Sequence, residues 1–329
     1  MSPSQLSTAI KACYDLRLPL FIWGAPGIGK SDVVRRAAAD MKIELVDKRL
    51  GQSDPTELKG MPWPDQAKKV MKFFQDSQLP TKGKGILFLD ELSHAPNAVQ
   101  AVAFQLVLDR RLGDYELPAG WHVVAAGNRM TDRAGAQTMN AALDNRFTHV
   151  EMKVSNQDWH DWAQRNGISP LTTGFMRYRP EHLCIDKIEP GARAFHTPRA
   201  WAKADAIMQS NLPDEVAREL IYGTVGEGVG NEYIGYCRSH ASLVSIDRIL
   251  ADPEHAPLPV GAAPTYAVVS LLERQVNVSN IAHLHKYIKR LTPEFQMVYM
   301  EAITRVDPDL QNTKTYIDWL MTNREAVLG

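Results

Sequence analysis

The residues with the clearest chemical potential lie in one glycine-rich segment, GAPGIGKS. Its members are Gly24, Ala25, Pro26, Gly27, Ile28, Gly29, Lys30 and Ser31. The spacing is that of a phosphate-binding loop, in which backbone N–H groups and the N-terminal end of a following helix surround phosphate oxygens. Lys30 would contact the β- and γ-phosphates, and Ser31 would bind Mg²⁺. The segment predicts a nucleoside triphosphate site, a property shared by kinases, motors, switches and chaperones.

A pair of carboxylates, Asp90 and Glu91, follows the apolar run ILFL. Ligands of open α/β sheets bind at the carboxyl ends of strands, so Asp90 is placed to coordinate Mg²⁺. Glu91 is suited to orient or deprotonate an attacking water. Alternatively, both residues only begin the next helix. Together with the phosphate loop, the pair indicates hydrolysis rather than transfer to a small acceptor.

Three more polar residues stand at element ends. Asn128 ends an apolar strand and could bind the water or the γ-phosphate, although asparagine also suits turns. Arg146 precedes the last strand, and Arg199 opens a helix in the second half of the chain. Arginine keeps its charge and offers a planar fork to phosphate oxygens. Each arginine taken singly could equally be a surface residue.

A parallel sheet is needed to bring these residues together. Short apolar runs predict five strands, at residues 18–23, 43–47, 86–90, 122–127 and 148–154. Amphipathic segments between them predict helices, and strands that alternate with helices indicate a parallel sheet covered on both faces. The predicted fold class is α/β, with helices dominating after residue 158. We expect a nucleotide-binding domain over 1–155, a linker over 156–196, a helical lid over 197–251 and a helical extension over 252–329.

The composition of the chain argues against several classes of protein. The chain has 329 residues, a net charge of −1 and 44% hydrophobic residues. A charge near zero gives no whole-chain field for nucleic acid. The apolar runs are too short to span a bilayer, and the first residues lack the pattern of a secretory signal. The three cysteines fit neither a disulfide framework nor zinc spacing. These features favour a cytoplasmic protein with no membrane span.

The order of these parts resembles that of the AAA+ ATPases, and within them the MoxR branch. The resemblance covers roughly residues 18–236. The segment RLGQSDPTELKGMPWPD is similar to the family's insertion after the second strand, and DRRLGDYELPAGWHVVAAGNRMTDRAGAQ to its hairpin before the sensor strand. VGEGVGNEYIGY resembles a stretch of the family's lid domain.

The resemblance implies a role for each matching residue. Lys30 and Ser31 bind phosphate and Mg²⁺, and Asp90 and Glu91 form the Walker B pair. Asn128 is the sensor 1 residue. Arg146 is the arginine finger that acts on the nucleotide of a neighbouring subunit, and Arg199 is the sensor 2 residue, acting in cis. Arg133 is either a second contact in trans or a plain loop arginine.

The same resemblance implies an ATP-hydrolysing homo-oligomer, most simply a hexameric ring. Such ATPases typically act with a von Willebrand factor A domain partner to remodel, activate or mature a protein complex. One alternative is a nucleic-acid motor of the helicase or translocase kind. Another is a slow, nucleotide-dependent switch or binding module.

Two insertions and one lysine-rich run could contact a substrate. Residues 51–64 carry Leu58, Met61 and Trp63, which either project towards a central pore or pack on their own domain. The hairpin at 110–121 either contacts substrate or extends the sheet. Residues 67–85 hold five lysines and two phenylalanines, which suit nucleic acid, but a solvated helix face is the favoured interpretation.

Overall fold

A computed structural model describes residues 1–74, 76–132, 141–240 and 246–324. The chain divides into two compact units, Met1–Ser155 and Asn156–Gly329. The first unit contains the predicted parallel sheet, and the second is helical in its described residues. No helix of the described residues is both long and apolar enough to cross a bilayer.

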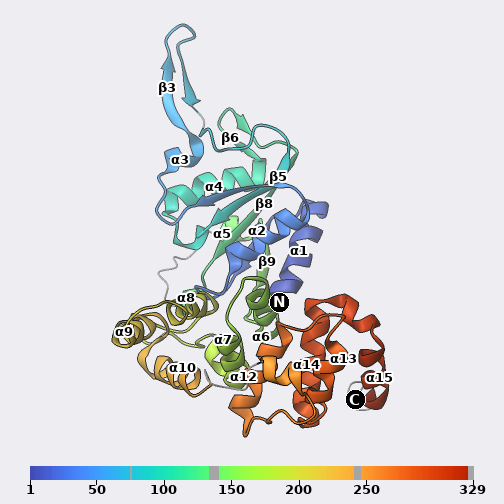
Figure 1. The fold of residues 1–329 in the computed structure, drawn as a ribbon. Helices are drawn as coiled ribbons and strands as arrows, with labels where there is room; N and C mark the ends of the chain where they lie inside the picture. The colour runs from blue at the N-terminus through green and yellow to red at the C-terminus, as the bar shows by residue number, and fades with distance from the viewer. Residues whose placement is uncertain (75, 133–140, 241–245, 325–329) are drawn as a thin grey trace. The chain divides into compact units, whose positions relative to one another are not determined.

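The central sheet has five parallel strands in the order β2-β5-β8-β1-β9 (Figure 1). They are β1 (Leu20–Trp23), β2 (Glu44–Arg49), β5 (Lys84–Asp90), β8 (Gly120–Gly127) and β9 (Thr148–Glu151). All five correspond to the predicted strands, which confirms the expected α/β class. Continuous apolar runs form these strands because helices cover a parallel sheet on both faces.

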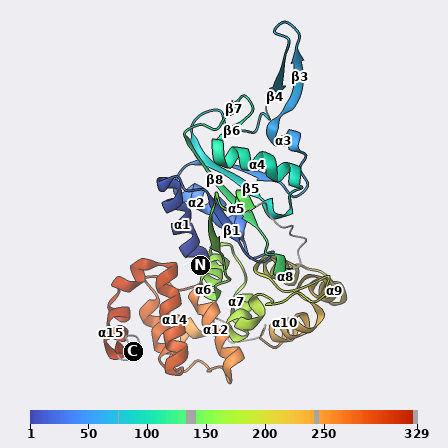
Figure 2. The same cartoon turned by 180° about the vertical axis from the view of Figure 1, so that it is seen from behind.

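Two helical layers enclose the sheet (Figures 1 and 2). On one face, Phe21, Leu87 and Val123 pack in a core with residues of α4 (Asn97–Asp109) and α5 (Ala141–Asp144). The other face lies against α1 (Pro3–Leu16) and α2 (Lys30–Asp40), and Tyr14 of α1 packs its ring edge against His122 of β8. Because successive side chains of a strand point to opposite faces of the sheet, each strand contributes apolar residues to the cores on both faces.

The insertion after β2 is a short helix followed by a hairpin. Helix α3 (Pro55–Lys59) leads into β3 (Met61–Asp65), which pairs antiparallel with β4 (Val70–Phe74). Leu58 is buried, whereas the Met61, Trp63, Met71 and Phe74 side chains are exposed. The helix predicted for part of residues 67–85 is therefore wrong, because cross-strand pairing with β3 holds this segment extended.

The predicted hairpin before β8 is present as β6 (Arg111–Leu112) and β7 (Tyr115–Glu116). It forms a two-stranded sheet of its own and does not extend the central one. Leu112 and Tyr115 are buried in the core beneath α4, which anchors the hairpin.

The second unit consists of helices. Its helices are α6 (Asn156–Arg165), α7 (Pro170–Tyr178), α8 (Pro198–Met208), α9 (Asp214–Val225), α10 (Glu227–His240), α11 (Ile246–Ala251), α12 (Ala262–Glu273), α13 (Ile281–Ile288), α14 (Pro293–Val306) and α15 (Lys314–Thr322). The connection between α7 and α8 spans residues 179–197. One core joins α11–α15 around Leu272, Tyr287 and Ile303.

The linker predicted over 156–196 is wrong for its first half, which holds α6 and α7. Ser169 caps α7 by accepting a hydrogen bond from the Thr172 N–H. Gly174, inside α7, lets the helix approach α12, because an added Cβ would lie 3.1 Å from the Ala267 Cα. The glycine serves tertiary packing here and does not mark a loop.

Candidate nucleotide-binding site

The phosphate loop joins β1 to α2 and depends on glycine at several positions. Gly27 and Gly29 have φ angles of 77° and 97°, in the left-handed region that glycine adopts without steric cost. Gly24 is required because there is no space for a side chain: a Cβ would lie 2.7 Å from the Ile28 Cδ1 and 3.0 Å from the Met152 oxygen. The loop leads directly into the N-terminal end of α2, where free N–H groups favour anions.

Lys30 joins the loop to the end of β8. Its Nζ donates to the Gly24 oxygen at 2.6 Å, to the Ala25 oxygen at 3.0 Å and to the Asn128 Oδ1 at 2.7 Å. Lys30 is 9% exposed, so its ammonium is largely withdrawn from water. Two of the predicted residues, 98 positions apart, are therefore in direct contact.

Ser31 joins the loop to the end of β5. Its Oγ donates to the Asp90 Oδ2 at 2.6 Å. A hydroxyl and a carboxylate oxygen this close are the donor set Mg²⁺ prefers when substrate phosphates and waters complete its shell. The residues present thus fit the predicted metal. Burial, and then the Asp90 charge, raise the pKa of the nearby Asp47 carboxyl.

Glu91 has a left-handed backbone, with φ of 58°. That conformation is uncommon for a residue with a side chain and is frequent at functional sites. The Glu91 side chain is exposed and lies against Gly51, where an added Cβ would be 2.6 Å from its Oε2. The carboxylate is therefore at the surface, beside the start of the insertion.

Ser93 links this turn to Asn128, a contact that the sequence did not suggest. Its fully buried Oγ accepts a hydrogen bond from the Asn128 N–H at 3.0 Å. Gly127 leaves room for it, since a Cβ there would lie 2.6 Å from the Ser93 Oγ. One buried hydroxyl thus links the turn after β5 to the residue that follows β8.

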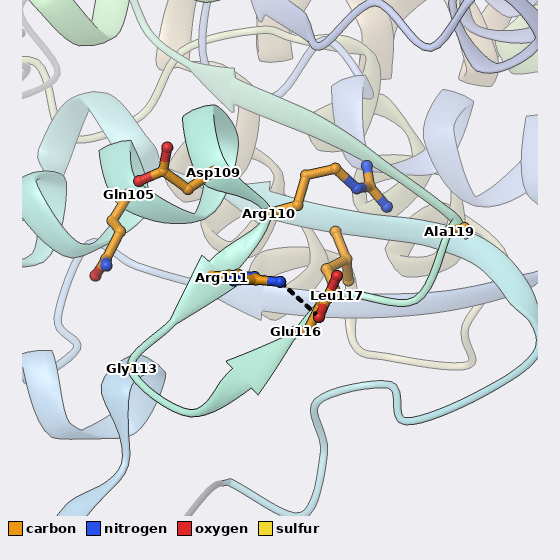
Figure 3. Close-up of a pocket in the computed structure, with 8 residues that line it drawn as sticks. All are labelled: Gln105, Asp109, Arg110, Arg111, Gly113, Glu116, Leu117 and Ala119. Carbon is orange, nitrogen blue, oxygen red and sulfur yellow. Dashed lines mark hydrogen bonds and ion pairs between the residues drawn. The ribbon is translucent and has the colours of Figure 1, made fainter.

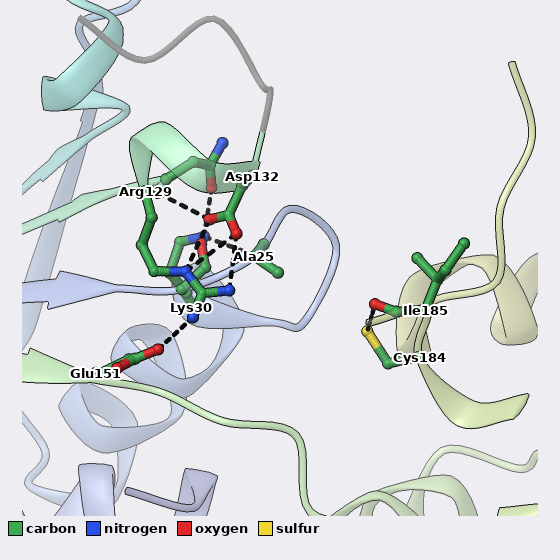
Figure 4. A network of polar contacts seen from close by, with 9 residues as sticks. Ala25, Lys30, Arg129, Asp132, Glu151, Cys184 and Ile185 are labelled. Carbon is green, nitrogen blue, oxygen red and sulfur yellow. Dashed lines mark hydrogen bonds and ion pairs between the residues drawn. The ribbon is translucent and has the colours of Figure 1, made fainter. Parts of the chain in front are cut away.

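Arg129 is a second residue that sequence reasoning missed (Figure 4). Its guanidinium contacts the Asp132 Oδ1 at 2.7 Å and also pairs with Glu151. Hydrogen bonds to Asp132 raise the pKa of Arg129. Gly127 and Glu151 both lie opposite Trp23, so the pair spans the end of β1, where the loop begins. In the sequence, only the i, i+3 spacing of Arg129 and Asp132 indicated that these two side chains could form an ion pair.

The two remaining predicted arginines belong to different units. Arg146 is exposed in the turn between α5 and β9, and its N–H donates to the Leu143 oxygen at 3.1 Å. Within the described part of the chain, the Arg146 guanidinium has no ion-pair partner. Arg199 is exposed in the first turn of α8, after the capping residue Thr197. Arg133 lies outside the described residues.

A separate hollow of about 550 Å³ lies between the end of α4 and the β6–β7 hairpin (Figure 3). Its charged lining includes Asp109, Arg110, Arg111 and Glu116, and it shares no residue with the phosphate loop. Arg111 and Glu116 pair with each other at 3.1 Å, and Arg110 donates to the oxygens of Pro118 and Trp121. Both arginines of this hollow and Glu116 are thus already partnered within the chain.

Comparisons with known proteins agree with the loop and the sheet. Residues 19–147 match the family model of the AAA domain of the dynein-related subfamily. This segment of the chain, which includes the loop, Asp90, Glu91, Asn128 and Arg146, is therefore similar to an AAA domain. A comparison with curated protein sequences gives no match.

The solved structures that match this chain share little of its sequence and have TM-scores of about 0.4. A protein of Cytophaga hutchinsonii assigned as an ATPase is 14% identical, with a TM-score of 0.39, and the match covers 68% of this chain and 81% of that one. NtrX from Brucella abortus in complex with ATP is 15% identical, with a TM-score of 0.38 and coverage of 72% and 64%. A RuvB mutant of Thermotoga maritima is 14% identical, with a TM-score of 0.41 and coverage of 87% and 85%.

Proposed function

We propose that this chain is a MoxR-like AAA+ ATPase that hydrolyses ATP at the interfaces of a homo-oligomeric ring. The observation that carries the proposal is that two residues of the phosphate loop each form a hydrogen bond with a residue at the end of a neighbouring strand. Lys30 contacts Asn128 at 2.7 Å, and Ser31 contacts Asp90 at 2.6 Å. Phosphate-binding, metal-binding and water-orienting groups are thus available within one small region.

Each side chain has a defined task in this proposal. The loop N–H groups and Lys30 hold the phosphates, and Ser31 and Asp90 hold Mg²⁺, which neutralises phosphate charge when bound. Glu91 orients and deprotonates the attacking water, for which an exposed carboxylate beside the metal ligand is suitable. Asn128 supplies a polar amide that can bind either the water or the γ-phosphate.

Arg146 completes the site of a neighbouring subunit, and Arg199 acts in cis from the helical unit. An exposed Arg146 without an ion-pair partner among the described residues is available to a second molecule. An arginine finger supplied in trans raises turnover by about 10³–10⁵-fold in other nucleotide hydrolases. A closed ring, most simply a hexamer, gives every subunit such a neighbour.

A concentration series tests the ring directly. ATPase turnover per chain should rise steeply as the protein assembles, in parallel with the assembled fraction measured by analytical ultracentrifugation. The Arg146→Ala variant should assemble but stay slow at every concentration. A rate per chain that stays constant down to the monomer would refute interface hydrolysis.

The work done by hydrolysis is proposed to be the remodelling of a protein complex, with a von Willebrand factor A domain partner. The β3–β4 hairpin supports this, because Trp63 is 58% and Phe74 is 64% exposed. Exposed apolar patches of this kind mark interaction sites. Stimulation of the ATPase by the partner, lost in Trp63→Ala but kept in the matched variant Met321→Ala, is the expected result.

A nucleic-acid motor is the second candidate, favoured by the lysines of the same hairpin. Lys68 and Lys69 in the hairpin turn and Lys72 opposite Trp63 are exposed, and lysines with stacking aromatics suit single strands. However, Lys72 pairs with Asp65 at 3.0 Å. Stimulation by single-stranded DNA that disappears in Lys68→Ala/Lys69→Ala would establish this function instead. Slow turnover that neither additive changes would indicate a nucleotide-dependent switch.

A further inference from the structure

Trp23, the residue directly before the phosphate loop, is bonded to a histidine of the neighbouring strand. Its Nε1 donates to the Nδ1 of His149 in β9 at 2.9 Å. The other ring nitrogen of His149 lies 2.8 Å from the backbone oxygen of Asp144, at the end of α5. One imidazole therefore joins the start of the loop to the segment that precedes Arg146.

The chemistry of the two partners fixes the state of this imidazole. An indole N–H can only donate and a carbonyl oxygen can only accept. His149 must therefore accept at Nδ1 and carry its proton at Nε2, which is one tautomer of the neutral ring. The bridge is consequently directional and does not depend on a charged histidine.

Aromatic packing holds the bridge in place. Phe21 lies opposite His149 in the register of β1 and β9, so Phe21, Trp23, Phe147 and His149 share one face of the sheet. The Phe21 and Trp23 ring centroids are 4.3 Å apart, and those of Trp23 and His149 are 6.1 Å apart with nearly parallel planes. The His149 side chain is exposed, and its stacking on Trp23 favours the ring orientation that makes both hydrogen bonds.

The Asp144 oxygen is also part of the turn that presents Arg146. It accepts the Phe147 N–H at 3.2 Å, while the Arg146 N–H donates to the Leu143 oxygen at 3.1 Å. His149 thus supplies a second hydrogen bond to a carbonyl that already closes this turn. Loss of that bond would loosen the backbone of Arg146 without touching the phosphate loop itself.

We propose that His149 is a positioning residue that couples the phosphate loop of one subunit to the Arg146 that the same subunit offers to its neighbour. The inference rests on the proposed function, since it assumes that Arg146 acts in trans. Through Trp23 and His149, movement of the loop on nucleotide binding changes the placement of Arg146. Each nucleotide site thereby influences the next site around the ring.

Steady-state ATPase measurements on the assembled full-length chain test this coupling. His149→Phe keeps an aromatic ring but removes both hydrogen bonds, and it should lower kcat about tenfold with KM changed less than twofold. His149→Gln retains an acceptor and a donor and should recover most of the activity. The matched variant His255→Phe, at a side chain that is 80% exposed, should leave kcat unchanged.

Comparison with Arg146→Ala separates this inference from the proposed function. If His149 acts through Arg146, the Arg146→Ala/His149→Phe double variant is no slower than Arg146→Ala alone. Multiplicative losses, or a normal kcat in His149→Phe while Arg146→Ala is slow, would overturn the coupling. A normal kcat in Arg146→Ala would overturn the trans role itself. If His149→Phe does not fold, Trp23→Phe breaks the Trp23–His149 hydrogen bond by removing the indole donor, and it is subject to the same comparison.

Discussion

Lys30 Nζ and Asn128 Oδ1 lie 2.7 Å apart, joining the helix that follows the phosphate loop to the end of the neighbouring strand β8. An ammonium has three N–H donors, and the Gly24 oxygen, the Ala25 oxygen and Asn128 accept from it. Lys30 must release at least one of these acceptors to bind a phosphate oxygen. Asn128 is the one side chain among the three, so it is free to turn towards the water or the phosphate when released.

Replacing Ser31 should weaken the response to Mg²⁺. Ser31→Ala removes a hydroxyl that lies 2.6 Å from Asp90, so the ion loses one protein ligand while the carboxylate remains. We expect the Mg²⁺ concentration for half-maximal ATPase activity to rise about tenfold, since a hydrogen bond or ligand at a charged group is worth roughly 1.5 kcal/mol or more. Ser31→Thr, which keeps the hydroxyl, is the control. Equal Mg²⁺ titrations for both variants would contradict the assignment.

Replacing Glu91 should slow hydrolysis without weakening nucleotide binding. Glu91→Gln keeps the size of the side chain but cannot take a proton, so kcat should fall by about 10²–10⁴-fold while nucleotide affinity changes little. Fluorescent-nucleotide titration and ATPase assays measure the two quantities. Glu116→Gln, at an exposed glutamate paired with Arg111, should behave like the parent protein. A parental kcat in Glu91→Gln would exclude Glu91 as the base.

Gly51 offers a way to move Glu91 without changing it. In Gly51→Ala the new Cβ would lie 2.6 Å from the Glu91 Oε2, and the flexible carboxylate can shift at small cost. We expect kcat to fall about tenfold through this displacement. The free energy of unfolding should stay level or rise by about 0.5 kcal/mol, because alanine restricts the unfolded chain.

The control for this variant is Gly223→Ala in α9, where an added Cβ meets no atom within 4 Å. It should gain stability in the same way and keep a parental kcat. Urea unfolding and ATPase assays on both variants decide the matter. A fall in stability that matches the fall in activity would show that Gly51 serves the fold and not the position of Glu91.

His122 should make the first unit less stable in mild acid. Burial, with a smaller contribution from Arg110, lowers the pKa of this β8 histidine to about 4 from its usual 6.5. The unfolded chain therefore binds a proton at a higher pH than the folded chain, and its protonation favours unfolding as the pH falls below 6.5. The stabilisation is complete above that value and is lost progressively down to about pH 4.

Between pH 7.5 and 5.5 we expect His122 to account for a loss of about 1 kcal/mol. His122→Val lacks the titrating group, so its urea midpoint should fall less over this interval than that of the parent protein. Parallel pH dependence of the two proteins would contradict the buried, neutral state of His122.

The central sheet and the main contacts of the site could be predicted because their signals are local. Each strand is a continuous apolar run, and parallel pairing brings the ends of β5 and β8 beside the loop after β1. Lys30, Ser31, Asp90 and Asn128 therefore meet as expected.

What the sequence did not reveal depends on distant partners. The sequence predicts that residues 51–64 are an insertion that projects towards a pore or packs on its own domain, and it does not predict β3. A two-stranded hairpin leaves one edge of β3 unpaired, where the missing N–H of Pro62 and Pro64 costs little. The linker predicted over 156–196 contains α7, in which Gly174 allows close packing on α12. Trp23 and His149 are 126 positions apart, and nothing in either local pattern predicts their hydrogen bond.

Mixing two inactive variants tests the central claim, hydrolysis shared between neighbouring subunits, most directly. Lys30→Ala lacks the phosphate contact but keeps Arg146, and Arg146→Ala lacks the arginine but keeps the loop. In rings assembled from equal amounts, about one interface in four combines an intact loop with an intact arginine, so roughly a quarter of the parental turnover should return. Turnover of the mixture equal to the average of the two separate variants would contradict the account.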